Sequence, residues 1–331
     1  MQLKLLFYKI YFHIFILLCL STIFLGINSA NANQSKFSKT LVNEDFQFNY
    51  QWLDHQKSQQ SLSFKVPTDF IYNHFRGFKT YKPHIATKVI IRNIQKKLAT
   101  TSLQGVRFEY PQLASALSLN TAVKVTGSDP LNVQKAYAVV EKVRQEEEQR
   151  YFATNYYRTH IDHLNTLGIK IDHARIAKES IKSVKPISET ILDTVSKKDV
   201  RLVTNFILGF MQNIPYDTLE SKSNSSGSGF NPPMKLLFEN QGDCDSKMAL
   251  SVALLKATMP GIKIVIVYID QHVFLGINAK QRTGDKMLKF EDELYVLADP
   301  AGPSVLSLGE ISPSAELAIN QSAYVVEPYI K

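Results

Sequence analysis

The chain of 331 residues contains 38 lysines and arginines, 30 aspartates and glutamates, and 44% hydrophobic residues. These values are typical of a globular protein with a hydrophobic core, and they exclude a chain that stays disordered for lack of apolar residues. The formal charge of +8 is scattered along the sequence. We therefore expect contact with anionic surfaces rather than nucleic-acid binding.

The first 32 residues have the order of a secretory signal peptide. Lys4 and Lys9 precede an apolar stretch over residues 10–25, and Ala30-Asn31-Ala32 is a small-x-small cleavage pattern. The stretch is short for a membrane span, which favours cleavage over an uncleaved anchor. We expect an exported protein, periplasmic or secreted, with membrane contact only through an uncleaved N-terminal segment. Removal of Lys4 and Lys9 would leave 36 basic against 30 acidic residues, or about +6.

Cleavage would also leave the mature chain with one cysteine. Of the two cysteines, Cys19 lies within the expected signal peptide and Cys244 lies in the C-terminal third. An internal disulfide is then excluded. A single thiol in an oxidising compartment is either a reactive group or a buried, inert residue.

Residues 33–128 are expected to form a β-rich N-terminal module. Residues 33–45 are polar and predict a loose leader. Aromatic residues then alternate with polar ones over residues 46–52, a period of two that predicts a half-buried strand. Further strands are expected at residues 62–66, 89–91 and 106–110.

Residues 129–198 read as a helical middle segment. A stretch rich in Ala, Glu, Lys, Gln and Arg over residues 131–166 keeps an apolar stripe at helical spacing. Residues 174–198 predict a second helical stretch, with a break at Pro186.

Three histidines in this segment raise the question of a metal. His160 and His163 are three residues apart, and His173 follows a break at Gly168. No cysteine or carboxylate set with ligand spacing accompanies them, so we expect no metal site there.

Residues 199–331 carry the candidate chemistry. An apolar helix is expected over residues 200–211, ending at 213–216. Residues 221–229, SKSNSSGSG, predict a flexible loop. A surface insertion is the commoner meaning of such a loop, and a mobile lid is the alternative, because it precedes Cys244 closely.

Cys244 is expected in the first turn of a buried helix. Gly242 supplies a turn, Asp243 is a good N-cap, and the apolar run that follows stops at Pro260-Gly261. The free N–H groups and the dipole at a helix start favour a thiolate. Asp243 and Asp245 act in the opposite direction and raise the thiol pKa, so a basic partner must contribute most of the activation.

The following strands supply that partner. Residues 262–269, 273–277 and 293–298 predict three short strands with tight connections, which would pair antiparallel. His272 opens the second strand and Asp299 follows the third. A start and an end lie side by side in antiparallel strands, so His272 would take the Cys244 proton while Asp299 holds the imidazole tautomer.

These motifs resemble the transglutaminase-like superfamily. The resemblance covers residues 200–310 and rests on Tyr216, on the Gly-Asp-Cys-x-x-Lys motif at 242–247, on His272-Val273, and on Tyr-x-x-x-Asp at 295–299. More narrowly, the chain is similar to the bacterial transglutaminase-like cysteine proteinases. One departure is Pro300, where many relatives place Thr after the acidic residue.

The resemblance implies an α+β fold with a papain-like core, in which the helix bearing the cysteine packs on an antiparallel sheet. It also implies Cys244 as nucleophile, His272 as base and Asp299 as the residue that orients it. The short gap between Cys244 and His272 disfavours papain itself. No cofactor or metal is required by this chemistry.

The expected activity is cysteine-dependent amide hydrolysis through a thioester, as a peptidase or isopeptidase. The expected partner is a peptide or protein substrate, and substrates associated with the cell envelope are included in this expectation. Tyr216 and Gln241 are candidate oxyanion donors beside the Cys244 N–H. Two alternatives remain open at this point: an acyl transferase of the transglutaminase type, and a catalytically silent binding or scaffold protein.

Overall fold

The computed structural model describes residues 34–110, 119, 122–195, 199–221 and 229–329, and it shows an α+β fold. The expected signal peptide with Cys19, and most of the loop at 221–229, lie outside these residues. The helices are α2 (Thr68–Tyr72), α3 (Pro83–Leu98), α4 (Pro130–Thr154), α5 (His173–Thr194), α6 (Val200–Asn213), α7 (Pro233–Glu239), α8 (Cys244–Thr258) and α9 (Pro313–Asn320). The strands are β1 (Gln34–Val42), β2 (Asp45–Leu53), β3 (Gln59–Pro67), β4 (Val106–Glu109), β5 (Lys124–Gly127), β6 (Tyr157–Ile161), β7 (Leu167–Ile171), β8 (Ile264–Ile269), β9 (His272–Ile277), β10 (Met287–Phe290), β11 (Glu293–Ala298) and β12 (Val325–Pro328).

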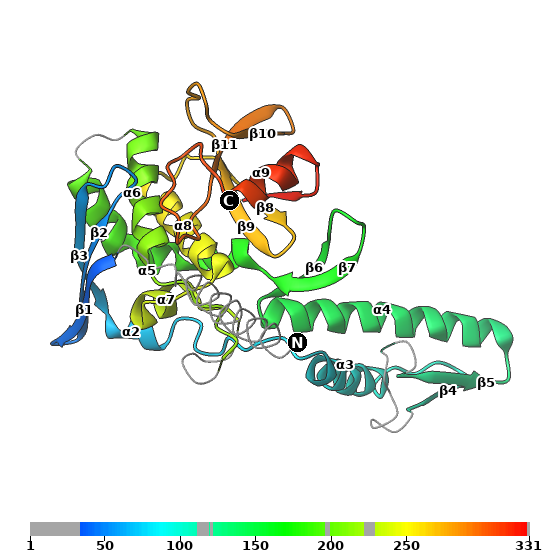
Figure 1. Ribbon diagram of the computed structural model, residues 1–331. Helices are drawn as coiled ribbons and strands as arrows, with labels where there is room; N and C mark the ends of the chain where they lie inside the picture. The colour runs from blue at the N-terminus through cyan, green and yellow to red at the C-terminus, as the bar shows by residue number, and fades with distance from the viewer. Residues whose placement is uncertain (1–33, 111–118, 120–121, 196–198, 222–228, 330–331) are drawn as a thin grey trace, which may run out of the picture.

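The main body has helices between two antiparallel sheets (Figure 1). One sheet has the order β1-β2-β3, and its β2 and β3 contact α6 and α5. The other sheet has the order β10-β11-β9-β8-β12, and its β9 contacts α8. Helix α9 covers the opposite face of this second sheet, where Ala315 packs against Val265 and Leu297.

The first sheet belongs to the main core because its aromatic residues point at the helices. Phe48, Tyr50 and Trp52 on β2 are buried, while the residues between them are half-buried or exposed. This is the period of two that the sequence predicts. The Tyr50 and Phe210 rings meet edge to face at 4.8 Å, which joins β2 to α6. Residues 46–67 therefore contribute to the core that surrounds α8.

Helix α8 lies at the centre of this core. Every residue from Met248 to Leu255 is buried. A helix that is apolar all round is stable only when it is covered on every side. Helices α5, α6 and α7 and strand β9 all contact it. The N-terminus of α8, which bears Cys244, is thus held by a helix that is buried over most of its length.

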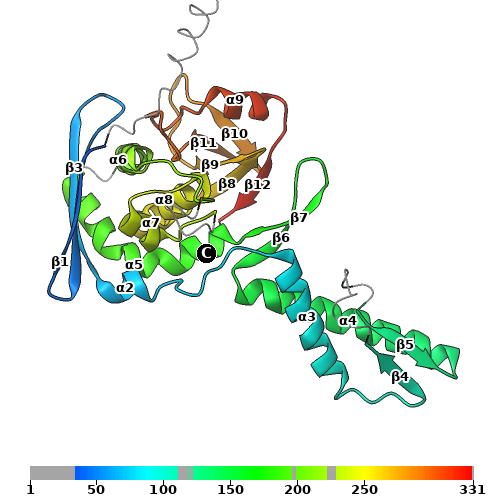
Figure 2. The same cartoon turned by 60° about the horizontal axis from the view of Figure 1, so that its bottom comes forward.

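A separate arm projects from this body (Figures 1 and 2). It consists of α3, the β4–β5 hairpin and most of α4. Its own small core contains Ile90, Ile94 and Leu98 of α3, packed with Val143 of α4. Helix α4 ends where the β6–β7 hairpin returns the chain to the body (Figure 2).

Several expected elements are confirmed and others are wrong. The strands at 46–52, 62–66 and 106–110 are β2, β3 and β4. The strand expected at 89–91 is wrong, because these residues belong to α3. Buried residues recur along this helix at Ala86, Ile90, Ile94 and Leu98, which is the spacing of one helix face.

Three further expectations need correction. The leader at 33–45 contains strand β1, which pairs with β2 along most of its length. The helix expected to reach Thr166 ends at Thr154, and a β-hairpin follows. Pro186 does not break α5, although it removes one backbone hydrogen bond. Val184 and Ile187 are buried on either side of it, so core packing holds both halves in line.

Among the described residues, no helix combines the length and the apolar character that a membrane crossing requires.

Candidate active site

Cys244 is the first residue of α8, as the sequence predicts. The Asp243 carboxylate caps the helix by accepting the Ser246 N–H at 2.9 Å. The Cys244 side chain is half-buried, and its sulfur accepts hydrogen bonds from the backbone N–H groups of Asp245 and Val273. Val273 directly follows His272, so the thiol lies against the start of β9.

His272 and Asp299 are brought together by the register of the second sheet. Strands β9 and β11 pair antiparallel through Leu275 and Ala298. His272 precedes this pair and Asp299 follows it, on adjacent strands. The His272 Nε2 and the Asp299 Oδ2 are 2.9 Å apart, which is a hydrogen-bond distance. This nitrogen faces Asp299, so the other ring nitrogen, Nδ1, remains for proton transfer.

The loop after β11 fixes the Asp299 carboxylate. Its Oδ1 accepts the Ala301 N–H at 3.0 Å. The Gln212 amide on α6 donates to the Asp299 backbone oxygen at 2.7 Å and to the Leu306 oxygen at 2.9 Å. Gly302 follows with φ +67°, and a Cβ there would lie 2.3 Å from the Gln212 oxygen. Only glycine allows this close approach of the loop to α6.

Lys247 ties the same loop to α8. Its side chain is fully buried, and its Nζ donates to the Ile214 and Ala301 oxygens, both at 2.6 Å. Burial lowers the pKa of Lys247 to about 7, although the charges of Asp299, Asp243 and Cys244 act to raise it. The lysine of the Gly-Asp-Cys-x-x-Lys motif is thus a cross-link between the cysteine helix and the loop that carries Asp299.

The thiol itself is held in its neutral form. Burial raises the pKa of Cys244 well above its usual range, and the charges of Asp245 and Asp243 raise it further. The N–H groups of Asp245 and Val273 lower it only in part. The Sγ donates to the Asp245 Oδ1 at 3.8 Å, a sulfur hydrogen bond that keeps the proton on the thiol. The expectation that the flanking aspartates oppose ionisation is therefore confirmed.

Asp243 and Asp245 are themselves perturbed. Burial, and then the charge of Asp245, raise the pKa of Asp243 to about 7. Burial also acts to raise the pKa of Asp245, but His173 and Lys170 outweigh it, and the net shift is downward. Of the two aspartates, Asp245 is therefore the more strongly ionised beside the thiol at neutral pH.

A second histidine reaches the site from α5. His173 is buried, its Nε2 lies 3.4 Å from the Asp245 Oδ2, and its Nδ1 lies 3.2 Å from the Tyr268 hydroxyl on β8. Neither contact could be predicted from the sequence, because His173 is far from both Cys244 and Tyr268 along the chain. His173 is the first residue of α5, and the preceding Asp172 caps this helix by accepting the Arg175 N–H.

His272 is poised to accept a proton. Burial acts to lower its pKa, but the hydrogen bond to Asp299 and the charges of Asp299 and Asp245 outweigh burial and raise it. The imidazolium is favoured relative to an isolated histidine. A base of this kind can take the thiol proton once a substrate displaces the contact between Cys244 and Asp245.

The two candidate oxyanion donors both lie beside Gly242, the glycine of the turn that precedes Cys244. Tyr216 forms a parallel bridge with Gly242, and its side chain is 48% exposed. Burial, and then the charge of Cys244, raise the pKa of Tyr216 to about 12, so its hydroxyl stays a donor. The backbone oxygen of Gln241 accepts from the Asn231 side chain at 3.2 Å. Tyr216 and Gln241 thus lie on the two chain segments that pair next to Cys244.

Within the described part of the chain, no group of three His, Cys, Asp or Glu residues has the geometry to hold a metal ion. The histidines of the middle segment do not converge on one point. The His160 Nδ1 lies 3.3 Å from the Glu327 carboxylate, whereas the His173 Nε2 lies beside the Asp245 carboxylate.

Comparison with protein-family models, curated proteins and solved structures found no match to this chain. A thiol at a helix start, an imidazole on the adjacent strand and a carboxylate behind the imidazole can together perform nucleophilic acyl transfer.

Proposed function

We propose that the chain is an exported cysteine-dependent amide hydrolase, a peptidase or isopeptidase with a transglutaminase-like core. One observation carries the proposal: His272 is held by Asp299 at 2.9 Å on the strand whose Val273 N–H reaches the Cys244 thiol. The helix that bears Cys244 packs on the antiparallel sheet that bears the other two residues. This is the layout that a papain-like core requires.

The reaction follows from these positions. His272 Nδ1 takes the proton of the Cys244 thiol, and the sulfur attacks an amide carbonyl carbon of the substrate. The C–S bond forms, His272 returns the proton to the amide nitrogen, and the C–N bond breaks to release the amine. Water, deprotonated by His272, then attacks the thioester carbon and forms a C–O bond. The C–S bond breaks, the acid leaves, and His272 returns the proton to the sulfur of Cys244. The Cys244 N–H and a donor from Tyr216 or Gln241 would hold the oxyanion.

The neutral thiol favours a second candidate as well, a silent binding or scaffold protein with the same core. Its hydrogen bond to Asp245 and its raised pKa would suit a cysteine that never reacts. A transferase, in which an amine replaces water, is the third candidate. It differs from the hydrolase only in the acceptor.

The first experiment compares the parent protein with Cys244→Ala and Cys244→Ser on a mixture of cell-envelope proteins, with new termini read by mass spectrometry. We expect turnover to vanish in both variants while the melting temperature changes little, because the site is half-buried. Parent-like cleavage by Cys244→Ala would exclude the mechanism. An intact protein that cleaves nothing would favour the scaffold, and labelled amine incorporated into the products would identify the transferase.

The second experiment tests export. Expressed in a bacterial host with a secretory pathway, the protein should accumulate outside the cytoplasm with a mature N-terminus at Asn33, directly after the Ala-Asn-Ala pattern. Mass spectrometry of the purified protein measures that terminus. A full-length chain in the cytoplasm would contradict the proposal.

A further inference from the structure

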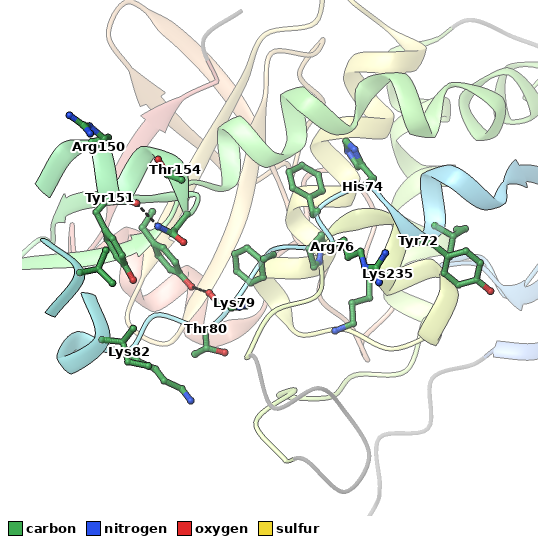
Figure 3. Close-up of a pocket in the computed structure, with 18 of the residues that line it drawn as sticks. Tyr72, His74, Arg76, Lys79, Thr80, Lys82, Arg150, Tyr151, Thr154 and Lys235 are labelled. Atoms are coloured by element: carbon green, nitrogen blue, oxygen red, sulfur yellow. Dashed lines mark hydrogen bonds between the residues drawn. The ribbon is translucent and has the colours of Figure 1, made fainter. Parts of the chain in front are cut away.

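A large cleft lies where the arm meets the body. Its volume is about 880 Å³, and it is lined by the connector between α2 and α3, by the end of α4 and by α7. Figure 3 shows the labelled side chains spread in a row, from Arg150, Tyr151 and Lys82 at one end to Tyr72 at the other. This layout suits an extended segment. Cys244, His272 and Asp299 do not line the cleft.

The cleft is strongly basic. Five lysines and arginines line it against one acidic residue, Glu239. Two of the five are paired: Arg150 with Glu147 at 2.7 Å, and Lys235 with Glu239 at 3.7 Å.

The other three cations, Arg76, Lys79 and Lys82, are exposed and make no ion pair with the residues that the structure describes. They follow one another at intervals of three residues on a connector without regular structure. The Phe78 N–H donates to the Phe75 oxygen at 2.9 Å, so Arg76 lies in a turn, and consecutive cations are at most about 10 Å apart along the chain. A ligand with negative charges at or below that spacing would meet all three.

Aromatic rings alternate with these cations. Phe75 and Phe78 on the same connector are half-buried and line the cleft, and Phe238 of α7 faces it from the body. The Phe78 ring packs 6.1 Å from Tyr157, which anchors the connector by donating to the Lys79 oxygen. The rings offer apolar contact between the charges, and arginine and lysine beside them can also bind carboxylates.

We propose that this cleft, formed by the 74–82 connector, α4 and α7, binds an acidic peptide segment in which carboxylates alternate with aromatic side chains. The segment belongs to the protein substrate, so the cleft is an exosite that selects substrates at a distance from Cys244. The part of this inference that concerns substrates rests on the proposed function. The binding of acidic peptide does not.

Binding is tested with the full-length Cys244→Ala protein and a fluorescein-labelled peptide of about four Glu-Phe-Ser repeats, followed by fluorescence anisotropy. The triple charge reversal Arg76→Glu/Lys79→Glu/Lys82→Glu should weaken binding at least tenfold. The matched control is Lys65→Glu/Lys135→Glu/Lys289→Glu, which reverses three exposed lysines that do not line the cleft. It should weaken binding less than threefold.

Two further peptides separate specific from general attraction. A repeat with Gln in place of Glu should bind at least tenfold more weakly, and so should a repeat with Ala in place of Phe. If the Ala repeat or dextran sulfate binds as tightly as the Phe repeat, the cleft attracts polyanions in general and the peptide proposal is overturned. Equal losses in the two triple variants would overturn it too, because the effect would then come from net charge.

The substrate role is tested by cleavage-site profiling of envelope proteins with an otherwise intact Cys244. Cleavage sites should lie near acidic, aromatic-rich segments, and this enrichment should disappear in the Arg76/Lys79/Lys82 variant while total cleavage of short peptides persists. If cleavage depends on Cys244 but shows no enrichment, the exosite is wrong and the hydrolase stands. If no cleavage depends on Cys244, the proposed function is wrong, and peptide binding is judged by anisotropy alone.

Discussion

Two histidine–aspartate pairs flank Cys244, and they differ in geometry and in effect. His272 and Asp299 are 2.9 Å apart, and the carboxylate is locked from behind by the Ala301 N–H. His173 and Asp245 are 3.4 Å apart, and this carboxylate faces the thiol itself. The first pair raises the basicity of an imidazole, whereas the second keeps a proton on sulfur.

A histidine–aspartate pair can therefore either promote or oppose ionisation of the thiol. The effect depends on whether the imidazole or the carboxylate faces the sulfur. An imidazole between the sulfur and a carboxylate can carry a proton away. A carboxylate next to the sulfur opposes the negative charge that the thiolate would need. We infer that Cys244 rests as a neutral thiol and that substrate binding must separate it from Asp245 before His272 can act.

The largest difference between the pairs should appear in turnover. Asp299→Asn keeps the shape of the side chain but loses the charge that orients and stabilises the His272 imidazolium, so kcat/KM should fall by about 10³-fold or more. Asp245→Asn should keep at least the parent turnover. Steady-state kinetics on a peptide identified by the cleavage profiling would measure both. Equal losses in the two variants would show that the pairs are not distinct.

The second difference lies in how firmly each carboxylate is held. Gln212→Leu removes the hydrogen bonds from the side chain to the Asp299 and Leu306 oxygens, so we expect about 2 kcal/mol lower stability and about tenfold lower turnover. Asn213→Leu is the matched control. This neighbour on α6 donates to the Leu53 and Gly209 oxygens and does not contact the Asp299 loop.

Urea unfolding and kinetics separate the two effects. Both variants should lose stability, but only Gln212→Leu should lose turnover per folded molecule. If Asn213→Leu loses turnover to the same degree, the support of Asp299 by Gln212 is not specific.

The locked pair is also the one that the sequence predicts. Cys244 begins α8, His272 begins β9 and Asp299 follows β11, and the turns and strand patterns around them are local signals. Strands β8 and β9 are joined by a tight turn, and the antiparallel pairing of such neighbours needs no long-range information. Strand β10 separates β9 from β11 in the chain, so the pairing that brings His272 beside Asp299 also depends on the β10–β11 hairpin, and β10 was not among the strands predicted from the sequence. The Asp243 cap is local in the same way.

The opposing pair could not be predicted, because His173 reaches Asp245 only through the packing of α5 on α8. Similar reasons explain the wrong elements. The three β-branched residues at 89–91 have a high propensity for strands. They nevertheless form part of helix α3, because a helix places one apolar face of this segment against α4. In the β6–β7 hairpin, Asp162 accepts the Leu164 and Thr166 N–H groups and so stabilises the turn. This turn signal was missed because the long, charge-rich helical pattern before it was extended to Thr166.

A third prediction concerns the reactivity of the thiol. Asp245→Asn removes the hydrogen-bonded charge next to sulfur, so the pKa of Cys244 should fall and alkylation by iodoacetamide near pH 8 should speed up. For every tenfold gain in thiolate, the lower basicity reduces the intrinsic nucleophilicity by about threefold, which leaves a net gain of about threefold. Stopped-time labelling with mass spectrometry measures the rate. Asp292→Asn, in the exposed turn between β10 and β11, is the control and should alkylate at the parent rate.

The smallest expected difference lies in the pH dependence of stability. The pKa of His272 is raised in the folded protein, whereas an unfolded histidine titrates near about 6.5. Below about pH 6.5 both states are protonated, and the attraction between His272 and Asp299 contributes fully to stability. As the pH rises through the folded pKa, the imidazolium loses its proton and this contribution is lost.

Asp299→Asn has no such contribution to lose, so the difference in unfolding free energy between parent and variant should shrink from pH 6 to pH 9. Urea unfolding across this range, with Cys244→Ser in both proteins, measures it. Parallel curves would mean that the His272 imidazolium gains nothing from Asp299, and the two pairs would then differ in position alone.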